Sequence, residues 1–219
     1  MEDIDLGRSF EYENGFYLTA SAGRFTKFAT HLDLYRKAAG LAGQIIECGV
    51  FKGVSLSRFV KFRSMFGHVQ AKRITAFDTF GPFPDAQFDD DKEKRQQFID
   101  EAGDTSITVE RLTELLEANG LNDNIEFVAG NLLETAVGYV AAHPQLKISL
   151  LHVDVDLYEA TKAALDAFYP AVVRGGIIIL DDYGAFPGAN KAIDEYFSGT
   201  DIRVQTLPYS NAISFVEKP

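Results

Sequence analysis

Several features that mark specialised classes of protein are absent or scarce in this chain of 219 residues. It has one cysteine, Cys48, which excludes an intrachain disulfide framework and fits a reducing compartment. No run approaches the roughly 18 apolar residues of a membrane span, and the acidic start MEDIDLGRSFEYE lacks the apolar stretch of a secretory signal. These absences predict a cytoplasmic protein.

Positive charge is also scarce. The chain carries 21 Lys and Arg against 32 Asp and Glu, which gives a formal net charge of -11. Surfaces that bind a phosphate backbone or an anionic membrane need an excess of cations. We therefore expect neither nucleic acid nor a membrane as the main partner, and the sequence leaves a homo-oligomer open.

What the chain does have is a regular alternation of short apolar runs with segments of helical periodicity. The predicted strands are 43–50, 73–80, 124–130, 146–156 and 175–184. The predicted helices are 23–43, 55–66, 108–120, 132–142, 158–173 and 190–197, and 201–207 pairs with 211–218 as a closing antiparallel hairpin. This order predicts one α/β domain over 1–219, with a Rossmann-like, doubly wound, mostly parallel sheet covered by helices on both faces.

Two segments fall outside this alternation. Residues 1–43, which include the first helix, are predicted to form an N-terminal helical cover. Residues 83–105, FPDAQFDDDKEKRQQFIDEAGDT, are charge-dense and weakly periodic, which is typical of a lid over a site. The alternative is that DDDKEKR is a solvated helix face with no such role.

The end of the first strand, IIECGVFKGVS, combines an acid with a glycine turn. In sheets of this type ligands bind beyond the carboxyl ends of the strands. Glu47 lies in a run that should be buried, while Gly49 and Gly53 bracket a turn that enters a helix at Ser55. Glycines let the backbone approach a ligand, and the helix N-terminus offers free N–H groups. An ordinary turn with a serine cap is the alternative.

Asp78 ends the second strand. An acid at this position can accept hydrogen bonds from both ribose hydroxyls of a nucleoside, although it can equally cap a turn. Together with the glycine turn, it favours a ligand that contains adenosine.

Two pairs of acids follow the fourth and fifth strands, Asp154 with Asp156 and Asp181 with Asp182. Because these strands should be neighbours, the four carboxylates are expected at one edge of the sheet. Crowded carboxylates repel one another until a proton or a cation relieves them. Oxygen ligands suit Mg²⁺, Mn²⁺ or Ca²⁺. The alternative is four separately capped or solvated acids.

These segments resemble the macrocin O-methyltransferase family. The matching elements are IIECGVFKGVS, AFDTF, LLHVDVDLYEAT and GGIIILDDYGAFPGANKAIDEYF, which span roughly residues 45 to 197. The resemblance implies a class I methyltransferase fold and a Mg²⁺-dependent enzyme. Such an enzyme moves a methyl group from S-adenosylmethionine to a hydroxyl of a small-molecule acceptor, a sugar or similar vicinal diol.

The resemblance also implies a role for each matching residue. Asp154, Asp181 and Asp182 match the metal ligands, which leaves Asp156 as general base. The cofactor-binding residues that it implies are Thr19, Glu47, Gly49, Val50, Phe51, Gly53, Ser55, Asp78, Thr79, Phe80, Gly130, Asn131 and Asp154.

Two other functions fit part of the pattern. A D-x-D after an apolar strand and a later acidic pair also resemble a haloacid-dehalogenase-type phosphatase, but the glycine turn and Asp78 would then have no role. A non-catalytic module that binds an adenosine ligand is the other alternative. The sequence does not name the acceptor, and the stretch before the first helix offers little material for a substrate cover.

Overall fold

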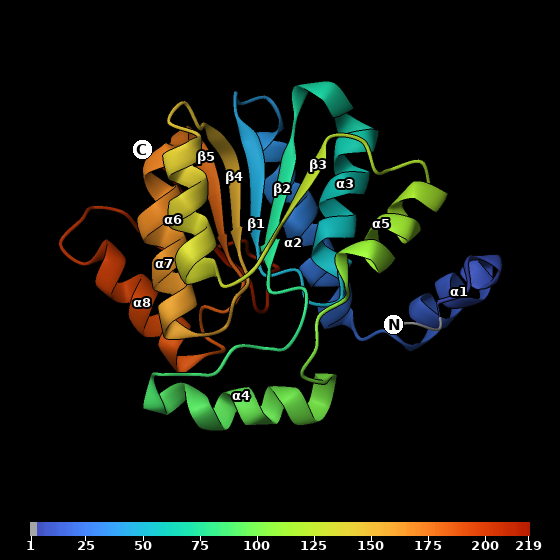
Figure 1. The fold of residues 1–219 in the computed structure, drawn as a ribbon, viewed down its shortest axis with the longest axis horizontal. Helices are drawn as coiled ribbons and strands as arrows, with labels where there is room; N and C mark the ends of the chain where they lie inside the picture. The colour runs from blue at the N-terminus through green and yellow to red at the C-terminus, as the bar shows by residue number, and fades with distance from the viewer. Residues whose placement is uncertain (1–3) are drawn as a thin grey trace.

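The strands of the chain form one seven-stranded sheet in the computed structural model, which describes residues 4–219. The strands are β1 (Gln44–Cys48), β2 (Ile74–Asp78), β3 (Ile125–Ala129), β4 (Ile148–Val153), β5 (Val172–Leu180), β6 (Gln205–Thr206) and β7 (Ser214–Glu217). Their order is β3-β2-β1-β4-β5-β7-β6 (Figure 1). β1 to β5 are parallel, whereas β7 pairs antiparallel with both β5 and β6. The predicted sheet and its closing hairpin are confirmed.

Helices cover both faces of the sheet (Figure 1). The helices of the described chain are α1 (Ser9–Thr19), α2 (Ala22–Ala39), α3 (Val54–Phe66), α4 (Asp89–Ala102), α5 (Val109–Ala118), α6 (Leu132–Ala142), α7 (Tyr158–Phe168) and α8 (Pro187–Phe197), of which α1 and α4 do not cover a face. α2, α3 and α5 share one apolar core with one face of the strands, and α6, α7 and α8 share a second core with the other. Ile45 and Ile46 point into different cores, as the two-residue period of a strand requires.

The central strands end earlier than their apolar runs suggest. β4 stops at Val153 and β5 at Leu180, so the acids that follow lie in the loops beyond the strands. The predicted helix 158–173 is wrong at its end. α7 stops at Phe168, a short 3-10 turn covers Tyr169–Ala171, and β5 begins at Val172. Pro170 lies in that turn, and β-branched Val172 and Val173 favour a strand.

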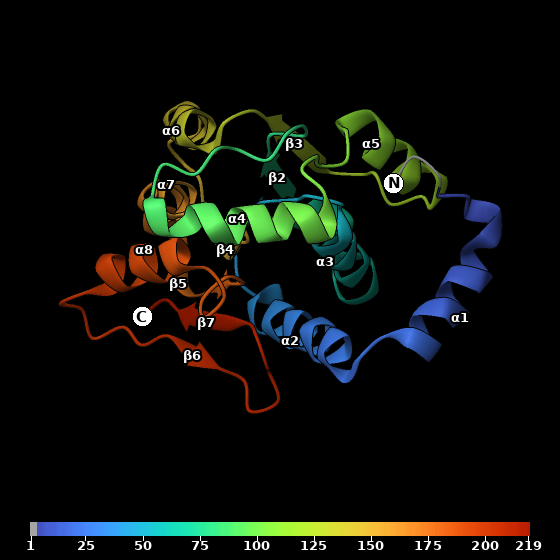
Figure 2. The same ribbon diagram turned by 90° about the horizontal axis from the view of Figure 1, so that it is seen from below.

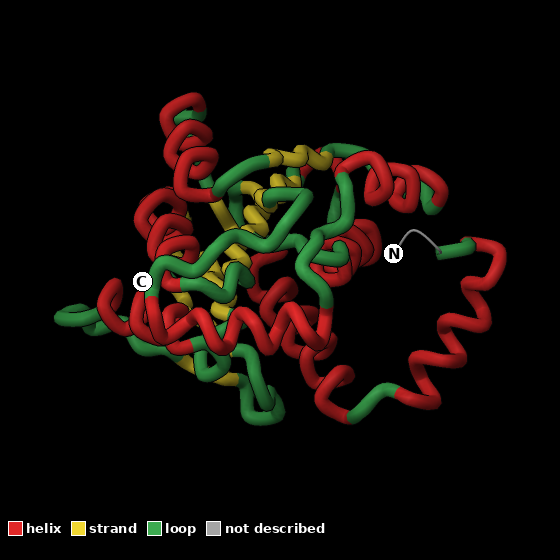
Figure 3. The backbone as a smooth tube through the Cα atoms, turned by 60° about the horizontal axis from the view of Figure 1, so that its bottom comes forward, coloured by secondary structure: helices red, strands yellow, loops and turns green. Residues whose placement is uncertain are grey.

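Residues 83–105 contain α4, which crosses one edge of the sheet (Figure 2). α1 extends away from the other helices (Figure 3), and all of its side chains are at least partly exposed. Residues 1–3 of the predicted N-terminal cover lie outside the described part of the chain. Within residues 4–219, no helix has the length and apolar content to cross a membrane.

Candidate functional site

The turn after β1 lies directly against the loop after β4. Gly49 has a φ of 90°, and a Cβ at this position would overlap the carbonyl oxygen of Asp154. The Asp154 N–H donates to the Cys48 carbonyl at 2.9 Å, which brings the two loops together. Only glycine combines this backbone conformation with so close an approach.

Asp78 fixes this turn from the end of β2. Its Oδ2 accepts hydrogen bonds from the N–H groups of Val50 at 2.7 Å and Phe51 at 2.9 Å. Its Oδ1 accepts the N–H of Phe80 at 2.8 Å. A carboxylate has about four acceptor positions, and the three backbone N–H groups occupy three of them. The Thr79 hydroxyl lies 3.3 Å from Oδ1 and 3.0 Å from the Pro82 carbonyl, so the fourth position is open to a ligand only when that hydroxyl donates to Pro82. Its role toward a ribose stays a prediction.

A pocket opens beyond the strand ends, beside this turn. Eight of the predicted site residues line it: Gly49, Phe51, Asp78, Thr79, Gly130, Asn131, Asp154 and Asp156. The predicted residues that are not part of its lining are Thr19, Glu47, Val50, Gly53, Ser55, Phe80, Asp181 and Asp182. Thr19 is the exposed last residue of α1 and donates to the Gly15 carbonyl. The sequence reasoning missed the apolar wall that Phe83, Pro84 and Phe98 supply.

Three carboxylates meet beside the pocket, and two of them, Asp154 and Asp156, line it. Oxygen atoms of Asp154, Asp156 and Asp182 lie within 4.8 Å of one another. β4 and β5 are neighbours, so the loops that follow them are adjacent. The backbone N–H of Asp156 donates to Asp182 Oδ2 at 2.8 Å, and Asp156 adopts a φ of 63°. The structure therefore brings together three of the four predicted acids.

The three acids are electrostatically strained. Burial, with the neighbouring Asp181, raises the pKa of Asp154 to about 6. Burial, with the charge of Asp154, raises the pKa of Asp156 to about 7. Burial, with Asp156, also raises the pKa of Asp182 well above its usual value. A divalent cation would relieve this strain, and three carboxylates are the oxygen donors that Mg²⁺, Mn²⁺ and Ca²⁺ prefer. The residues present fit such an ion.

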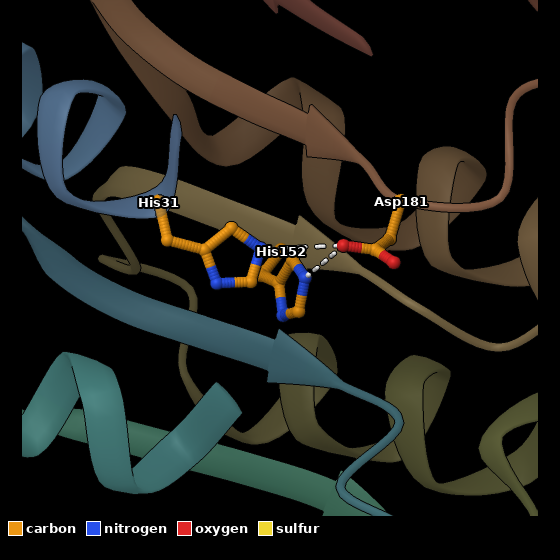
Figure 4. A group of neighbouring side chains, drawn as sticks. All are labelled: His31, His152 and Asp181. Atoms are coloured by element: carbon orange, nitrogen blue, oxygen red, sulfur yellow. Dashed lines mark hydrogen bonds and ion pairs between the residues drawn. The ribbon is translucent and has the colours of Figure 1, made fainter. Parts of the chain in front are cut away.

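Asp181 points to a different set of partners (Figure 4). Its Oδ2 accepts from Lys27 Nζ at 2.5 Å, and its Oδ1 lies 3.2 Å from His31 Nε2. His152 Nε2 lies 3.5 Å from the same Oδ1. Burial alone would raise the pKa of Asp181, but His152, His31 and Lys27 lower it well below its usual value. The structure does not bring the Asp181 carboxylate into the group of three, and its role as a metal ligand stays a prediction.

His152 is part of a polar network and not an isolated core histidine. Its Nδ1 lies 3.3 Å from Glu47 Oε1, and the two residues are register partners in β4 and β1. Both are fully buried. Burial alone would lower the pKa of His152, but its contacts with Asp181 and Glu47 raise it to about 10. Glu47 therefore connects through His152 to the end of β5.

The sequence reasoning missed Lys27 and His31. Both lie on α2, four residues apart and therefore on one face of the helix. A cation and a histidine at this spacing are a signal, but the sequence does not say that this face meets the end of β5. Burial alone would lower the pKa of Lys27, but Asp154 and Asp181 raise it.

Known proteins with similar sequences are named as O-methyltransferases. The chain is 29% identical to the 8-demethyl-8-(2,3-dimethoxy-alpha-L-rhamnosyl)-tetracenomycin-C 4'-O-methyltransferase of Streptomyces olivaceus, over 73% of this chain and 59% of that protein. It is 28% identical to the mycinamicin III 3''-O-methyltransferase of Micromonospora griseorubida, over 72% of this chain and 61% of that protein. The chain thus spans about three fifths of the length of these curated relatives.

A solved structure resembles nearly the whole chain. The calicheamicin methyltransferase CalS11 superposes with a TM-score of 0.78 and 27% identity, over 95% of this chain and 85% of that one. A family model described as Macrocin-O-methyltransferase (TylF) matches residues 22–207. This match includes the glycine turn, Asp78 and all four acids of the strand ends. The chain belongs to the macrocin O-methyltransferase family.

Proposed function

We propose that the protein transfers a methyl group from S-adenosylmethionine to a hydroxyl group of a sugar or similar vicinal diol. The observation that carries this proposal is that one pocket is lined both by the glycine turn with Asp78 and by two acids, Asp154 and Asp156. These two acids and Asp182 form a cluster of three carboxylates, called here the carboxylate group. Membership of the family and the sugar O-methyltransferase names of the relatives support it.

The cofactor is assigned to the side of the pocket formed by the first three strand ends. Gly49 and Phe51 border it at the turn, Asp78 offers carboxylate oxygens to a ribose, and Asn131 follows β3. Phe83 and Phe98 add an apolar wall from the lid segment. A closed apolar wall excludes water and holds the reactive methyl in a fixed position, which lowers the barrier to transfer.

The carboxylates of Asp154 and Asp182 are assigned to a divalent cation. When bound, such an ion polarises an acceptor hydroxyl and lowers its pKa. The third acid of the group, Asp156, is assigned as general base. Its carboxyl group lines the pocket, so its ionised form can take a proton from an acceptor bound there.

The reaction balances with these assignments. The acceptor oxygen gives its proton to Asp156 and forms a bond to the methyl carbon, while the bond from that carbon to the cofactor sulfur breaks. The products are the methyl ether and S-adenosylhomocysteine. The proton then leaves Asp156 for solvent.

Incubation with methyl-labelled S-adenosylmethionine and a panel of sugars and catechols tests the proposal. Label should appear in an acceptor, and chelation of divalent ions should reduce the rate. Catechols belong in the panel because they also offer two vicinal oxygens. Cofactor binding without transfer to any acceptor would favour a non-catalytic module, and hydrolysis of a generic phosphate ester would favour the phosphatase alternative.

A further inference from the structure

One of three consecutive aspartates in α4 has an environment unlike the other two. Asp89 and Asp90 are exposed, whereas Asp91 is fully buried. Asp91 Oδ1 accepts the N–H of Gly188 at 2.7 Å, and its Oδ2 accepts the N–H of Tyr158 at 2.9 Å. Both carboxylate oxygens therefore bind backbone groups of other elements.

The two donor N–H groups lie in the first turns of α7 and α8, the helices that follow the loops with Asp156 and Asp182. Tyr158 is the first residue of α7, two residues after Asp156, and Gly188 is the second residue of α8, six after Asp182. N–H groups in the first turn of a helix have no partner within the helix and favour a negative charge. A single carboxylate from α4 thus accepts one free N–H group from the first turn of each helix.

The contact is also tight. A Cβ at Gly188 would overlap the carboxylate of Asp91. Gly188 has a helical backbone, so what it provides is space and not an unusual φ. Any larger residue at this position would push α4 away from α8.

α4 in turn carries one wall of the pocket. The ring of Phe98 lies 5.2 Å from Phe51 of the glycine turn and 5.5 Å from Phe83, measured between centroids. Arg95 donates to the carbonyls of Phe83 at 2.9 Å and Pro84 at 2.6 Å. The loop before α4 is therefore tied to the helix, and the position of the apolar wall depends on the position of α4.

We propose that Asp91 is a positioning residue that latches α4 over the pocket by joining it to the first residues of α7 and α8. The identity of the occupant, S-adenosylmethionine, rests on the proposed function. The latch itself rests only on the contacts of Asp91. Release of the latch opens the apolar wall, so the cofactor is lost more readily while the carboxylate chemistry remains in place.

Two substitutions break the latch from opposite sides. Asp91→Ala removes the acceptor, and Gly188→Ala inserts a methyl group where the carboxylate sits. Asp90→Ala, one residue away and exposed, is the matched control for helix propensity and charge. Asp91→Asn is a milder variant, because it keeps the shape and one acceptor oxygen. If Asp91→Ala does not fold, Asp91→Asn takes its place in the proteolysis and kinetic measurements.

Two readouts are measured for each variant. The first is the rate of limited proteolysis within residues 83–105 without cofactor, and the second is the KM for S-adenosylmethionine beside kcat. Asp91→Ala and Gly188→Ala should each raise the cleavage rate and the KM by roughly tenfold, as loss of hydrogen bonds to a buried charge predicts. The kcat should change much less, and Asp90→Ala should match the parent protein.

The double variant provides the sharpest comparison. Once Asp91 is alanine, the added methyl group at position 188 has no carboxylate to displace, so the double variant should resemble Asp91→Ala alone. Additive effects would overturn the latch. A raised cleavage rate with an unchanged KM would overturn the positioning role. Absence of methyl transfer in the parent protein would count against the proposed function, and the proteolysis comparison would still test the latch.

Discussion

Asp156 holds a backbone conformation that is uncommon for a residue with a side chain, with a φ of 63°. The hydrogen bond from its N–H to Asp182 Oδ2 helps to hold it there. Strain of this kind costs of order 1 to 3 kcal/mol and gathers at functional sites. The gain from this conformation is that the carboxyl group lines the pocket, beside two other acids.

Replacement of Asp156 by asparagine tests its role as base. Asparagine tolerates a positive φ and keeps the shape of the side chain, but it cannot take a proton. We expect kcat to fall by roughly 10² to 10⁴ and the affinity for S-adenosylmethionine to stay close to that of the parent protein. Steady-state kinetics and calorimetry measure the two quantities. A variant with nearly full kcat would remove Asp156 from the mechanism.

The raised pKa values make stability depend on pH in a predictable direction. The pKa values of Asp154 and Asp156 are about 6 and 7 in the folded protein and near 4 in the unfolded chain. The contribution of these two acids to the stability of the fold is therefore fully present only below about pH 4. That contribution is lost as the pH rises through the folded values. The pKa of Asp181 is lowered in the folded protein, so ionised Asp181 stabilises the fold at neutral pH. That stabilisation is lost only as the pH falls below about 4.

Mg²⁺ should therefore stabilise the protein more at pH 8 than at pH 5. At pH 8 Asp154 and Asp156 are ionised and can bind a cation, whereas at pH 5 protons compete with it. Thermal unfolding at both pH values, with and without Mg²⁺, measures the difference. Asp182→Asn should abolish most of the shift in Tm at pH 8. Equal shifts at the two pH values would contradict a cation site in this group.

At the scale of elements, the turn between β1 and α3 depends on the absence of a side chain at Gly49. Gly49→Ala should destabilise the fold by about 3 kcal/mol or more, because it adds a clash to an unfavourable φ. Gly199→Ala is the control. Gly199 also has a positive φ, of 73°, but a Cβ there would meet no described atom within 4 Å.

We expect the control to cost only about 1 to 2 kcal/mol, the usual penalty of a left-handed backbone. Denaturant unfolding of the two variants gives the comparison. Similar losses at both positions would mean that the turn can move away from the Asp154 carbonyl.

Most elements could be predicted from the sequence, because periodicity and glycine positions are local signals. The grouping of Asp154 with Asp182 was also within reach, since neighbouring parallel strands end at one edge. The pairing of Asp181 with Lys27 was not. It joins residues 154 positions apart through the packing of α2 near β5, which no local pattern encodes.

The segment 83–105 shows the same limit. Its charge pattern fits a solvated helix face as well as a lid, and the structure shows a helix with both solvated and buried acids. Asp89 and Asp90 are solvated, while Asp91 is buried against α7 and α8. Three identical neighbouring residues differ in role because only one faces the body of the protein, and that depends on how the helix packs.

At the scale of the whole molecule, the parallel sheet gathers chemistry from distant parts of the chain. Gly49, Asp78, Gly130 and Asp154 lie at or just after the ends of four different strands and line one pocket. α4 crosses this edge from one helical layer to the other (Figure 2). The proposed methyl transfer uses this arrangement, because cofactor and acceptor must meet at one point with water excluded.

The location of a bound cation tests this account most directly. A crystal structure of the protein with Mn²⁺ and S-adenosylhomocysteine, with anomalous data, would show it. We predict an anomalous peak for the cation within roughly 2 to 2.6 Å of carboxylate oxygens of Asp154 and Asp182, the metal–oxygen distance typical of hard cations. The peak should lie on the side of these acids that faces the sulfur of the product. A peak between His31, His152 and Asp181, or none at the carboxylate group, would contradict the account.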